Sequence, residues 1–600
     1  MHLRDVIVWA ASIILAGTLL ITAGTRLDYI NSQRQEMKLI SNEPLKNAPP
    51  SLAFATVAMG AFRGLVVDVL WMRADKLKEQ GQFFDARQLA EWITTLQPRF
   101  ASVWEFHAWN MAYNISVAIP ANQPDQRWRW VKNGYELLRD QGIPLNPKAI
   151  QLYRELARIF QHKMGGVSDD AHKYYKLQLA LAMEPLLQSE DNQLDSQDKR
   201  YFEALAKEAH TTWQHIVQDA NVAGLIAALK AADNEFADDD KFVSNYLSLR
   251  QNASRFKPQA GTVIDDFRGT GQLKKFDIFA KAYHLRNTWK LDPVLMRELN
   301  NVYGPTDVND PNRHYPLDWR HPDSHAIYWA VKGLREVSKD EAREIDIKET
   351  NTDRMVGHSL QNLFRNGKIF IYDAVVESSD GSSSQPIQKT TKQVFLRPDL
   401  RMFQPYNQAV LAVLEKYKGI GEGTYESLQN GHRNMLKNAA FLFYQTGHRQ
   451  QAREIYKQLG ELYPLQEFKV PLVVFARKRF LEELESIGIF DAKEQIIALL
   501  REGYFRFALR DDNAAFGREK LAQEIWDYYM SQYDDPEYRI DLPPLPRLKY
   551  MALFDFINDP WYPPNLRQSL LNRIQIERPK LYEQLRREEE LFRQETQEST

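Results

Sequence analysis

Residues 433–464 read RNMLKNAAFLFYQTGHRQQAREIYKQLGELYP and contain two helical patterns on either side of a glycine. Before Gly447, apolar residues recur at the i, i+3, i+4 and i+7 spacing of one helix face: Leu436, Ala439, Ala440 and Phe443. After it comes a second apolar helical set: Ala452, Ile455, Tyr456 and Leu459. Because Gly447 marks a helix end and Pro464 stops the second helix, the segment predicts a helix pair joined by a tight turn.

The same arrangement recurs near the beginning of the chain. Residues 67–100 again carry a small residue in the first helix, a glycine at the turn, a small residue in the second helix and a closing proline: Ala74, Gly81, Ala86 and Pro98. Two further units follow, one opening at Trp104 and Ala108, the other carrying Tyr153, Ala157 and Phe160. Small residues at Ala74, Ala108, Ala157 and Ala440 let the two helices of a pair cross closely, since a larger side chain would wedge them apart.

The unit that opens at Trp104 is longer than the others. Pro98 and Pro147 stand 49 residues apart (147 − 98), which exceeds a repeat period of about 34 residues by about 15. We expect the extra residues to form a loop near residues 119–124, a stretch that contains two prolines.

These units resemble tetratricopeptide (TPR) repeats, which pair two helices in about 34 residues. Residues 433–464 match the pattern of that family with Leu436 in place of the usual first tryptophan. Residues 67–100 depart further, since Leu70 takes the place of tryptophan and Arg73 occupies an expected apolar position. The resemblance implies a mainly α fold, a TPR-like α-solenoid of stacked helix pairs whose concave surface binds proteins or peptides.

Nineteen uncharged residues lie near the amino terminus, VIVWAASIILAGTLLITAG at residues 6–24. As a helix they would extend about 28 Å, close to the thickness of a bilayer core. We predict one transmembrane helix, an uncleaved anchor at residues 5–25, followed by a polar spacer at residues 26–50. A cleaved signal peptide is the alternative, although its apolar run is usually shorter. Anchor and repeats together resemble bacterial membrane-anchored helical-repeat proteins, which implies a single-pass protein of the inner membrane.

Two observations give opposing predictions for the side of the membrane on which the body lies. Arg26, Arg34 and Lys38 follow the apolar run and favour a cytoplasmic body. The chain has no cysteine, which suits an oxidising compartment. We expect an extracytoplasmic body.

Composition and missing motifs exclude several functions. Lysine plus arginine number 77 and aspartate plus glutamate 79, a net charge of −2, so nucleic acid is not an expected partner. The absence of cysteine excludes disulfides, thiolate zinc sites and iron–sulfur clusters. The sequence has no phosphate-binding loop and no G-x-S-x-G elbow. We therefore expect no cofactor and no catalysis.

Beyond the spacer, the chain divides into five predicted segments. In order these are TPR-like helical repeats at 51–190, an irregular helical region at 191–365, a β-hairpin insertion at 366–400, a TPR-like helical region at 401–535, and proline-rich connectors, helices and a disordered tail at 536–600. The hairpin is predicted from β-branched and aromatic residues in two stretches, 368–376 and 392–396.

Potential metal ligands gather in one segment, residues 307–325. Carboxylates and imidazoles at this spacing could bind a divalent ion: Asp310, His314, Asp318, His321, Asp323 and His325. We favour a structural role for these residues at the start of a helix, because no short zinc-binding signature is present. A helix then starts at Pro322, Asp323 caps its free N–H groups, and His325 lies where that helix enters the core.

The candidates for partner contacts are Trp128, Arg129 and Trp130, because tryptophan and arginine dominate interface hot spots. Packing of at least one tryptophan inside the protein is the alternative. We therefore expect a non-enzymatic, membrane-anchored scaffold that binds proteins or peptides. The alternatives are a metal-binding protein or enzyme centred on residues 310–325, and a cleaved secreted or periplasmic repeat protein.

Overall fold

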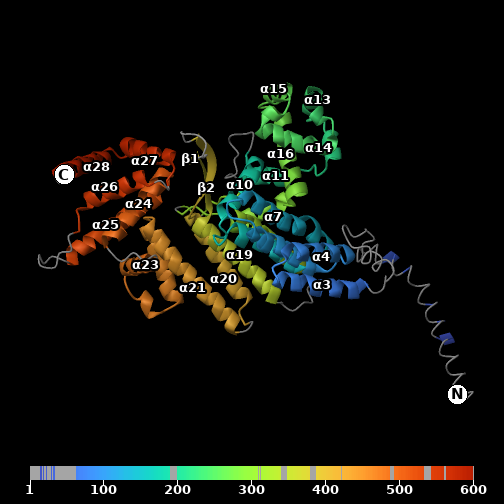
Figure 1. Cartoon of the computed structure of the whole chain (residues 1–600), viewed down its shortest axis with the longest axis horizontal. Coiled ribbons are helices and arrows are strands. Elements are labelled where there is room, and N and C mark those ends of the chain that lie inside the picture. Colours follow the sequence, from blue (N-terminus) through green and yellow to red (C-terminus); the bar gives the residue numbers. More distant parts are fainter. Residues whose placement is uncertain are drawn as a thin grey trace, which may run out of the picture. The chain divides into compact units, whose positions relative to one another are not determined.

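The protein is mainly helical and has one two-stranded sheet (Figure 1). Apart from isolated positions before residue 34, the computed structural model describes these ranges: 63–188, 199–308, 310, 312–338, 347–378, 387–419, 422–486, 492–532, 542–559 and 562–598. The chain forms two compact units. Unit 1 comprises Met1–Ile369 and Leu396–Pro405, and unit 2 comprises Phe370–Phe395 and Tyr406–Thr600. The prediction of a mainly α fold with an inserted hairpin is confirmed.

The predicted anchor at residues 5–25 and the spacer at 26–50 lie outside the described residues, except for isolated positions. Two of these, Ile14 and Leu15, are helical and 69% and 62% exposed. Among all residues that the structure describes, no helix is both long enough and apolar enough to cross a bilayer.

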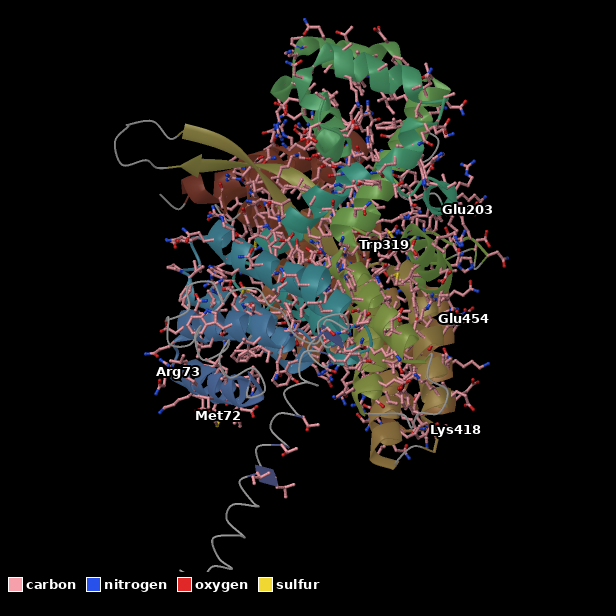
Figure 2. All side chains as sticks on the ribbon, turned by 90° about the vertical axis from the view of Figure 1, so that its right-hand side faces the viewer. Met72, Arg73, Glu203, Trp319, Lys418 and Glu454 are labelled. Carbon is pink, nitrogen blue, oxygen red and sulfur yellow. The ribbon has the colours of Figure 1, made fainter. Side chains whose placement is uncertain are left out.

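The first predicted pair consists of α3 (Arg63–Glu79) and α4 (Phe83–Leu96). They are joined at Gly81, whose φ of 75° is a conformation that glycine adopts without strain. The two helices share a buried core: Val67, Leu70 and Ala74 of α3 and Leu89, Ala90 and Ile93 of α4. Arg73 lies with Met72 on the exposed side of α3 (Figure 2), so its charge does not disturb this core.

The second pair is built from two composite helices. The first runs through α5 (Ala101–Trp109), η2 (Asn110–Ile115) and α6 (Ser116–Ala118), and the second through α7 (Pro124–Leu137), η3 (Leu138–Gly142) and α8 (Ile143–Leu145). Only residues 119–123 separate them, so the predicted loop of about 15 extra residues is wrong. The extra residues lengthen the helices instead, and each contains a π-helical turn, which accommodates inserted residues.

The third pair contains α9 (Ile150–Arg158), continued by η4 (Ile159–Met164), and α10 (His172–Leu187). Helices far along the sequence, α18 (Pro322–Ser338) and α19 (Ile347–Asn366), pack against α9. The approach of α18 is close, because a Cβ at Gly333 would lie 2.6 Å from Cβ of Tyr153. Trp319, just before α18, is fully buried (Figure 2).

The rest of unit 1 is helical, with the base of the hairpin at its carboxyl end. The helices are α11 (Lys199–Lys207), α12 (Trp213–Val217), α13 (Ala223–Ala232), α14 (Asp239–Gln251), α15 (Pro258–Asp266), α16 (Gly271–His284) and α17 (Pro293–Tyr303). The strands β1 (Lys368–Ser378) and β2 (Ile387–Arg397) pair as predicted, and the short helix η8 (Leu400–Met402) follows.

Unit 2 contains the helix pair predicted at residues 433–464. Its helices are α20 (Phe403–Lys416), α21 (Glu422–Gln445), α22 (Arg449–Leu462), α23 (Leu472–Ser486), α24 (Ala492–Ala508), α25 (Asp512–Gln532), α26 (Leu545–Asn558), α27 (Pro564–Glu577) and α28 (Pro579–Glu598). The helices α21 and α22 meet at Gly447, whose φ is 86°. A second pair, α24 and α25, packs closely beside them, since a Cβ at Gly517 would overlap the Gln445 carbonyl oxygen.

The carboxy-terminal helices predicted within residues 536–600 are present, and the predicted disordered end of the chain is not tested by the described residues. The helix α28 continues to Glu598 and packs against α26 and α27. Leu585 is buried, and the Arg547 guanidinium donates a hydrogen bond to the Glu588 carbonyl oxygen at 3.2 Å. Arg547 also lies 3.8 Å from the Glu588 carboxylate, so a buried leucine and contacts of Arg547 help to hold a segment whose composition is otherwise charged.

Replacing Ala157 with tryptophan tests the close packing of α9. Ala157 is fully buried, so Ala157→Trp should lower the free energy of unfolding by more than about 1 kcal/mol through overpacking. Circular-dichroism melting measures the effect. The matched control is Ala227→Trp, because Ala227 is an exposed residue within α13. If both variants melted like the wild type, the assignment of Ala157 to a close helix crossing would be wrong.

Candidate functional site

The residues predicted to pack the repeats lie mostly in the interior. Those buried in the structure are Ala74, Ala86, Pro98, Trp104, Ala108, Tyr153, Ala157, Phe160, Ala440 and Ala452. Tyr456 is half-buried and donates a hydrogen bond to the Val470 carbonyl oxygen at 2.9 Å. Pro464 is exposed just after α22. Most of these residues therefore belong to the interior of the two units.

The predicted contact residues in α7 are partly engaged within unit 1. Trp128 stacks on Tyr175 with ring centroids 6.0 Å apart, and Trp130 meets Phe84 edge-on at 5.6 Å. Both tryptophans are half-buried, whereas the Arg129 side chain is 75% exposed. The tryptophans thus join α7 to neighbouring helices, as the packing alternative states.

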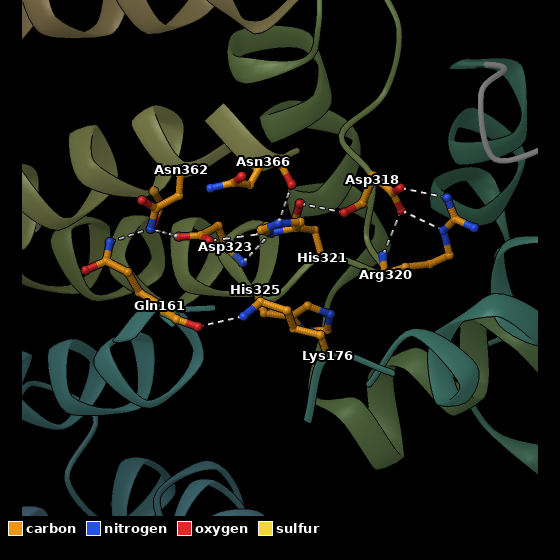
Figure 3. Close-up of polar contacts among 12 residues, drawn as sticks. Gln161, Lys176, Asp318, Arg320, His321, Asp323, His325, Asn362 and Asn366 are labelled. Atoms are coloured by element: carbon orange, nitrogen blue, oxygen red, sulfur yellow. Dashed lines mark hydrogen bonds and ion pairs between the residues drawn. The ribbon is translucent and has the colours of Figure 1, made fainter. Parts of the chain in front are cut away.

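The three histidines considered as metal ligands lie in different environments. His314 is exposed and pairs with Thr306 in an isolated β-bridge. His321 and His325 are fully buried at the start of α18 (Figure 3). Within the described part of the chain, no three histidine, aspartate or glutamate side chains are placed to hold a metal ion.

His321 and His325 bind backbone groups. His321 Nε2 donates to the Asn366 carbonyl oxygen at 3.1 Å, and its Nδ1 accepts the Asp323 N–H at 3.1 Å. His325 Nε2 donates to the Trp319 carbonyl oxygen at 2.9 Å. Burial lowers the pKa of both histidines to about 4, so both are neutral. The helix begins at Pro322 as predicted, but the side chain that caps its first turn is His321, which accepts the N–H of Asp323 itself.

The Asp323 side chain accepts its hydrogen bond from another helix. Its Oδ1 accepts a hydrogen bond from Asn362 Nδ2 at 3.0 Å. Burial raises the pKa of Asp323 to about 7, against hydrogen bonds from Asn362 and Ser359 and the positive charge of Lys176. Lys176 is itself buried and donates to the Gly166 carbonyl oxygen at 2.6 Å. These contacts join α18 to α19 and to the η4–α10 connection, which is a structural role.

A groove in unit 2 offers an open surface. Its volume is about 640 Å³, and residues of α21, α22 and α25, the start of α23 and the two residues before it line the groove: Tyr444, Arg449, Arg453, Tyr456, Lys457, Val470, Pro471, Leu472, Val473, Lys520 and Glu524. Exposed apolar residues and basic residues therefore line the same groove.

Contacts at the floor of the groove neutralise one of its charges. Arg449 Nη2 donates to Glu524 Oε1 at 2.7 Å, and the Tyr444 hydroxyl donates to Glu524 Oε2 at 3.0 Å. The Arg449 guanidinium also lies over the Tyr444 ring, 3.4 Å from its centroid. Glu524 is the single acidic residue among those that line the groove. Its charge is therefore already satisfied.

Three cations of the groove remain available. Arg453 and Lys520 are exposed, and neither has an ionic partner among the described residues. The Lys457 side chain is 77% exposed, with Glu461 3.8 Å away outside the groove. Among the apolar lining residues, Val473 is 57% exposed. The groove therefore combines uncompensated positive charge with exposed apolar surface.

Sequence reasoning missed this groove. Arg449, Arg453 and Lys457 follow each other at i, i+4 and i+8, which places them on one face of α22. That basic stripe was a usable signal. No sequence signal indicated that Lys520 and Glu524 contribute to the groove, because they lie more than a full helix pair further along the chain.

No family model matches this sequence, and no curated protein matches it significantly.

Asp323→Asn tests the environment at the start of α18. A carboxyl whose folded pKa of about 7 exceeds its unfolded value of 3.8 contributes stability below pH 3.8, and that contribution is lost as pH rises through 7. Asparagine cannot ionise, so it removes the free-energy cost of burying a charged carboxylate at alkaline pH. Its side-chain oxygen still accepts a hydrogen bond from Asn362. The change in unfolding free energy relative to wild type should therefore be more favourable at pH 8 than at pH 5, by up to roughly 3 kcal/mol.

Denaturant unfolding at the two pH values measures this difference. The control is Asp170→Asn, because Asp170 is exposed in the η4–α10 connection. Equal effects of Asp323→Asn at pH 5 and pH 8 would contradict a raised pKa at this carboxyl.

Proposed function

We propose that this chain is a non-enzymatic TPR-type scaffold, held at a membrane by its amino-terminal helix, that docks acidic peptide segments of partner proteins in the groove of unit 2. The observation that carries the proposal is the pairing of uncompensated cations with exposed apolar residues in that groove. Helical-repeat surfaces bind peptides through extended contacts of this kind.

The charge of the groove selects the class of partner. Arg453 and Lys520 have no ionic partner among the described residues, and Lys457 pairs only with the exposed Glu461 at 3.8 Å, so carboxylates of a partner gain attraction and basic segments are repelled. The groove volume of about 640 Å³ accommodates several side chains rather than one. An acidic segment with interspersed apolar side chains therefore fits both kinds of lining residue.

The packing of the third helix pair in unit 1 is a reason to place the docking surface in unit 2. There α18 and α19 pack against α9, and α18 also packs against η4. The side of the third helix pair that a partner would need is thus occupied by helices of the same chain. In unit 2 the face of α22 at Arg453 and Lys457 remains exposed.

The membrane part of the proposal rests on the uncharged residues 6–24. Their length matches a bilayer core, and the described residues Ile14 and Leu15 near its centre are helical and exposed. An anchor of this type would keep the docking groove at the membrane surface.

Fluorescence polarisation with the full chain in detergent tests the docking groove. The probe is a short fluorescein-labelled peptide in which glutamate alternates with leucine, and the comparison peptide carries lysine in place of glutamate. The double variant Arg453→Glu with Lys520→Glu should weaken binding of the acidic peptide about tenfold, because reversed charges repel its carboxylates. Lys478→Glu, an exposed residue of α23 outside the groove, is the matched control.

Two results would reject the groove as the docking site. One is wild-type affinity of the double variant for the acidic peptide. The other is equal binding of the acidic and basic peptides by the wild type.

Alkaline carbonate extraction of membranes tests the anchor. Arginine at the middle of a transmembrane helix costs about 2.5–3.5 kcal/mol per residue on insertion scales. The variant Ile14→Arg with Leu15→Arg should therefore shift the chain from the membrane pellet to the soluble fraction. Thr25→Arg, just beyond the apolar run, should stay in the pellet. A mature amino terminus near Gly24 or Thr25 by mass spectrometry would instead establish cleavage.

A further inference from the structure

The side chains that line the groove of unit 2 include many hydrogen-bond donors and few acceptors. Its cationic donors are Arg449, Arg453, Lys457 and Lys520. The one carboxylate among the described lining residues, Glu524, already accepts from Arg449 and from the Tyr444 hydroxyl. Among these same lining residues there is no asparagine, glutamine, serine, threonine or histidine. The side chains of the groove therefore offer little to the backbone N–H groups of an incoming peptide.

The backbone carbonyls of the lining residues are engaged as well. Most lie inside helices, where each carbonyl accepts from the N–H four residues later. Three lie at or just beyond a helix end, and each accepts within unit 2: Tyr444 from the Gly447 N–H at 3.2 Å, Val470 from the Tyr456 hydroxyl at 2.9 Å, and Pro471 from the Phe475 N–H at 3.1 Å. A peptide bound as a strand would therefore remove its inward N–H groups from water without giving them a partner, which is unfavourable.

A peptide bound as an α-helix avoids this cost, because a helix satisfies its own backbone groups and presents side chains to its neighbour. The donors of the groove then meet carboxylates. Arg453 and Lys457 are one turn apart on α22, about 6 Å along its axis, and acidic residues one turn apart on a partner helix have the same spacing. Lys457 also has Glu461 at 3.8 Å, a contact between two exposed side chains that competes weakly. Lys520 adds a cation from α25.

Apolar residues lie beside these cations. Val470 and Val473 line the groove and are 38% and 57% exposed. Tyr456 joins the two kinds of residue, because it belongs to α22 and its ring meets Phe475 of α23 with centroids 4.9 Å apart. A helix with an acidic face and an adjacent apolar face matches this combination.

The chain itself covers a helix pair with helices. In unit 1, α18 and α19 pack against α9 of the third pair. Rows of side chains four residues apart on one helix fit between those of another helix. The groove of unit 2 is lined mainly by residues of α21, α22 and α25, so a helix can pack against it in the same general way.

We propose that the acidic partner segment docks in the groove of unit 2 as an amphipathic α-helix. Its acidic side chains contact Arg453, Lys457 and Lys520, and its apolar side chains contact Val470 and Val473. This inference rests on the proposed function, which takes an acidic segment as the partner, and adds the conformation in which that segment is bound. Since ordering a peptide costs conformational entropy, a preformed helix binds more tightly than a disordered peptide of the same side chains.

Fluorescence polarisation with the full chain in detergent tests the bound conformation. Three fluorescein-labelled peptides carry the same glutamates and leucines at helical spacing. They differ at one central position on the remaining face, which is α-aminoisobutyrate, alanine or proline. The first residue favours a helix and proline breaks it, and circular dichroism of the free peptides establishes their order of helicity. Relative to the alanine peptide, the α-aminoisobutyrate peptide should bind about threefold more tightly and the proline peptide at least about tenfold more weakly.

Two variants of the chain serve as controls. Arg453→Glu with Lys520→Glu should weaken binding of the alanine and α-aminoisobutyrate peptides, and Lys478→Glu, outside the groove, should change neither the affinities nor their order. Equal affinities of the three peptides, or tightest binding of the proline peptide, would overturn the helical conformation. If the double variant still weakened that binding, the docking function would stand. Absence of binding of all three peptides to the wild type would instead reject the docking function and the helical conformation together.

Discussion

The burial of α18 is the constraint around which unit 1 is built. Residues 323–330 are each at most 1% exposed, and they include several polar side chains. A polar group without a hydrogen bond is costly in such a place. These side chains therefore contact backbone groups of neighbouring segments: Ser324 the carbonyl of Asp318, His325 the carbonyl of Trp319, and Tyr328 both the N–H of Asp292 and the carbonyl of Lys290. Asp323 Oδ2 and His325 Nδ1 are the exceptions in this stretch, since neither has a hydrogen-bond partner among the described residues.

A second consequence concerns the helix pairs that precede α18 in sequence. Burying a large side chain contributes about 1.5–3 kcal/mol, and α18 contributes several, Trp329 among them. The helices of the third pair gain that stability by packing against α18, and they give up the exposed face that a ligand-binding array requires. Unit 2 has kept such a face on α22. Similar helix pairs thus contribute to a buried core in unit 1 and to an exposed surface in unit 2.

Local features were predictable from the sequence, and contacts between distant segments were not. Gly81 and Gly447 identified two helix turns correctly, because a positive φ is a property of the turn itself. The β-branched stretches identified the hairpin for a similarly local reason. The π-helical turns η2 and η3 were missed, since inserted residues look the same in a sequence whether they extend a helix or form a loop. The groove was missed because it depends on segments that only the tertiary fold brings together.

The mobility of the cations in the groove of unit 2 bears on what that surface would recognise. In the groove of unit 2, Lys457 and Lys520 end in exposed ammonium groups on flexible stems. Mobile point charges accept carboxylates in many positions, so this surface favours a class of acidic segments over a single sequence.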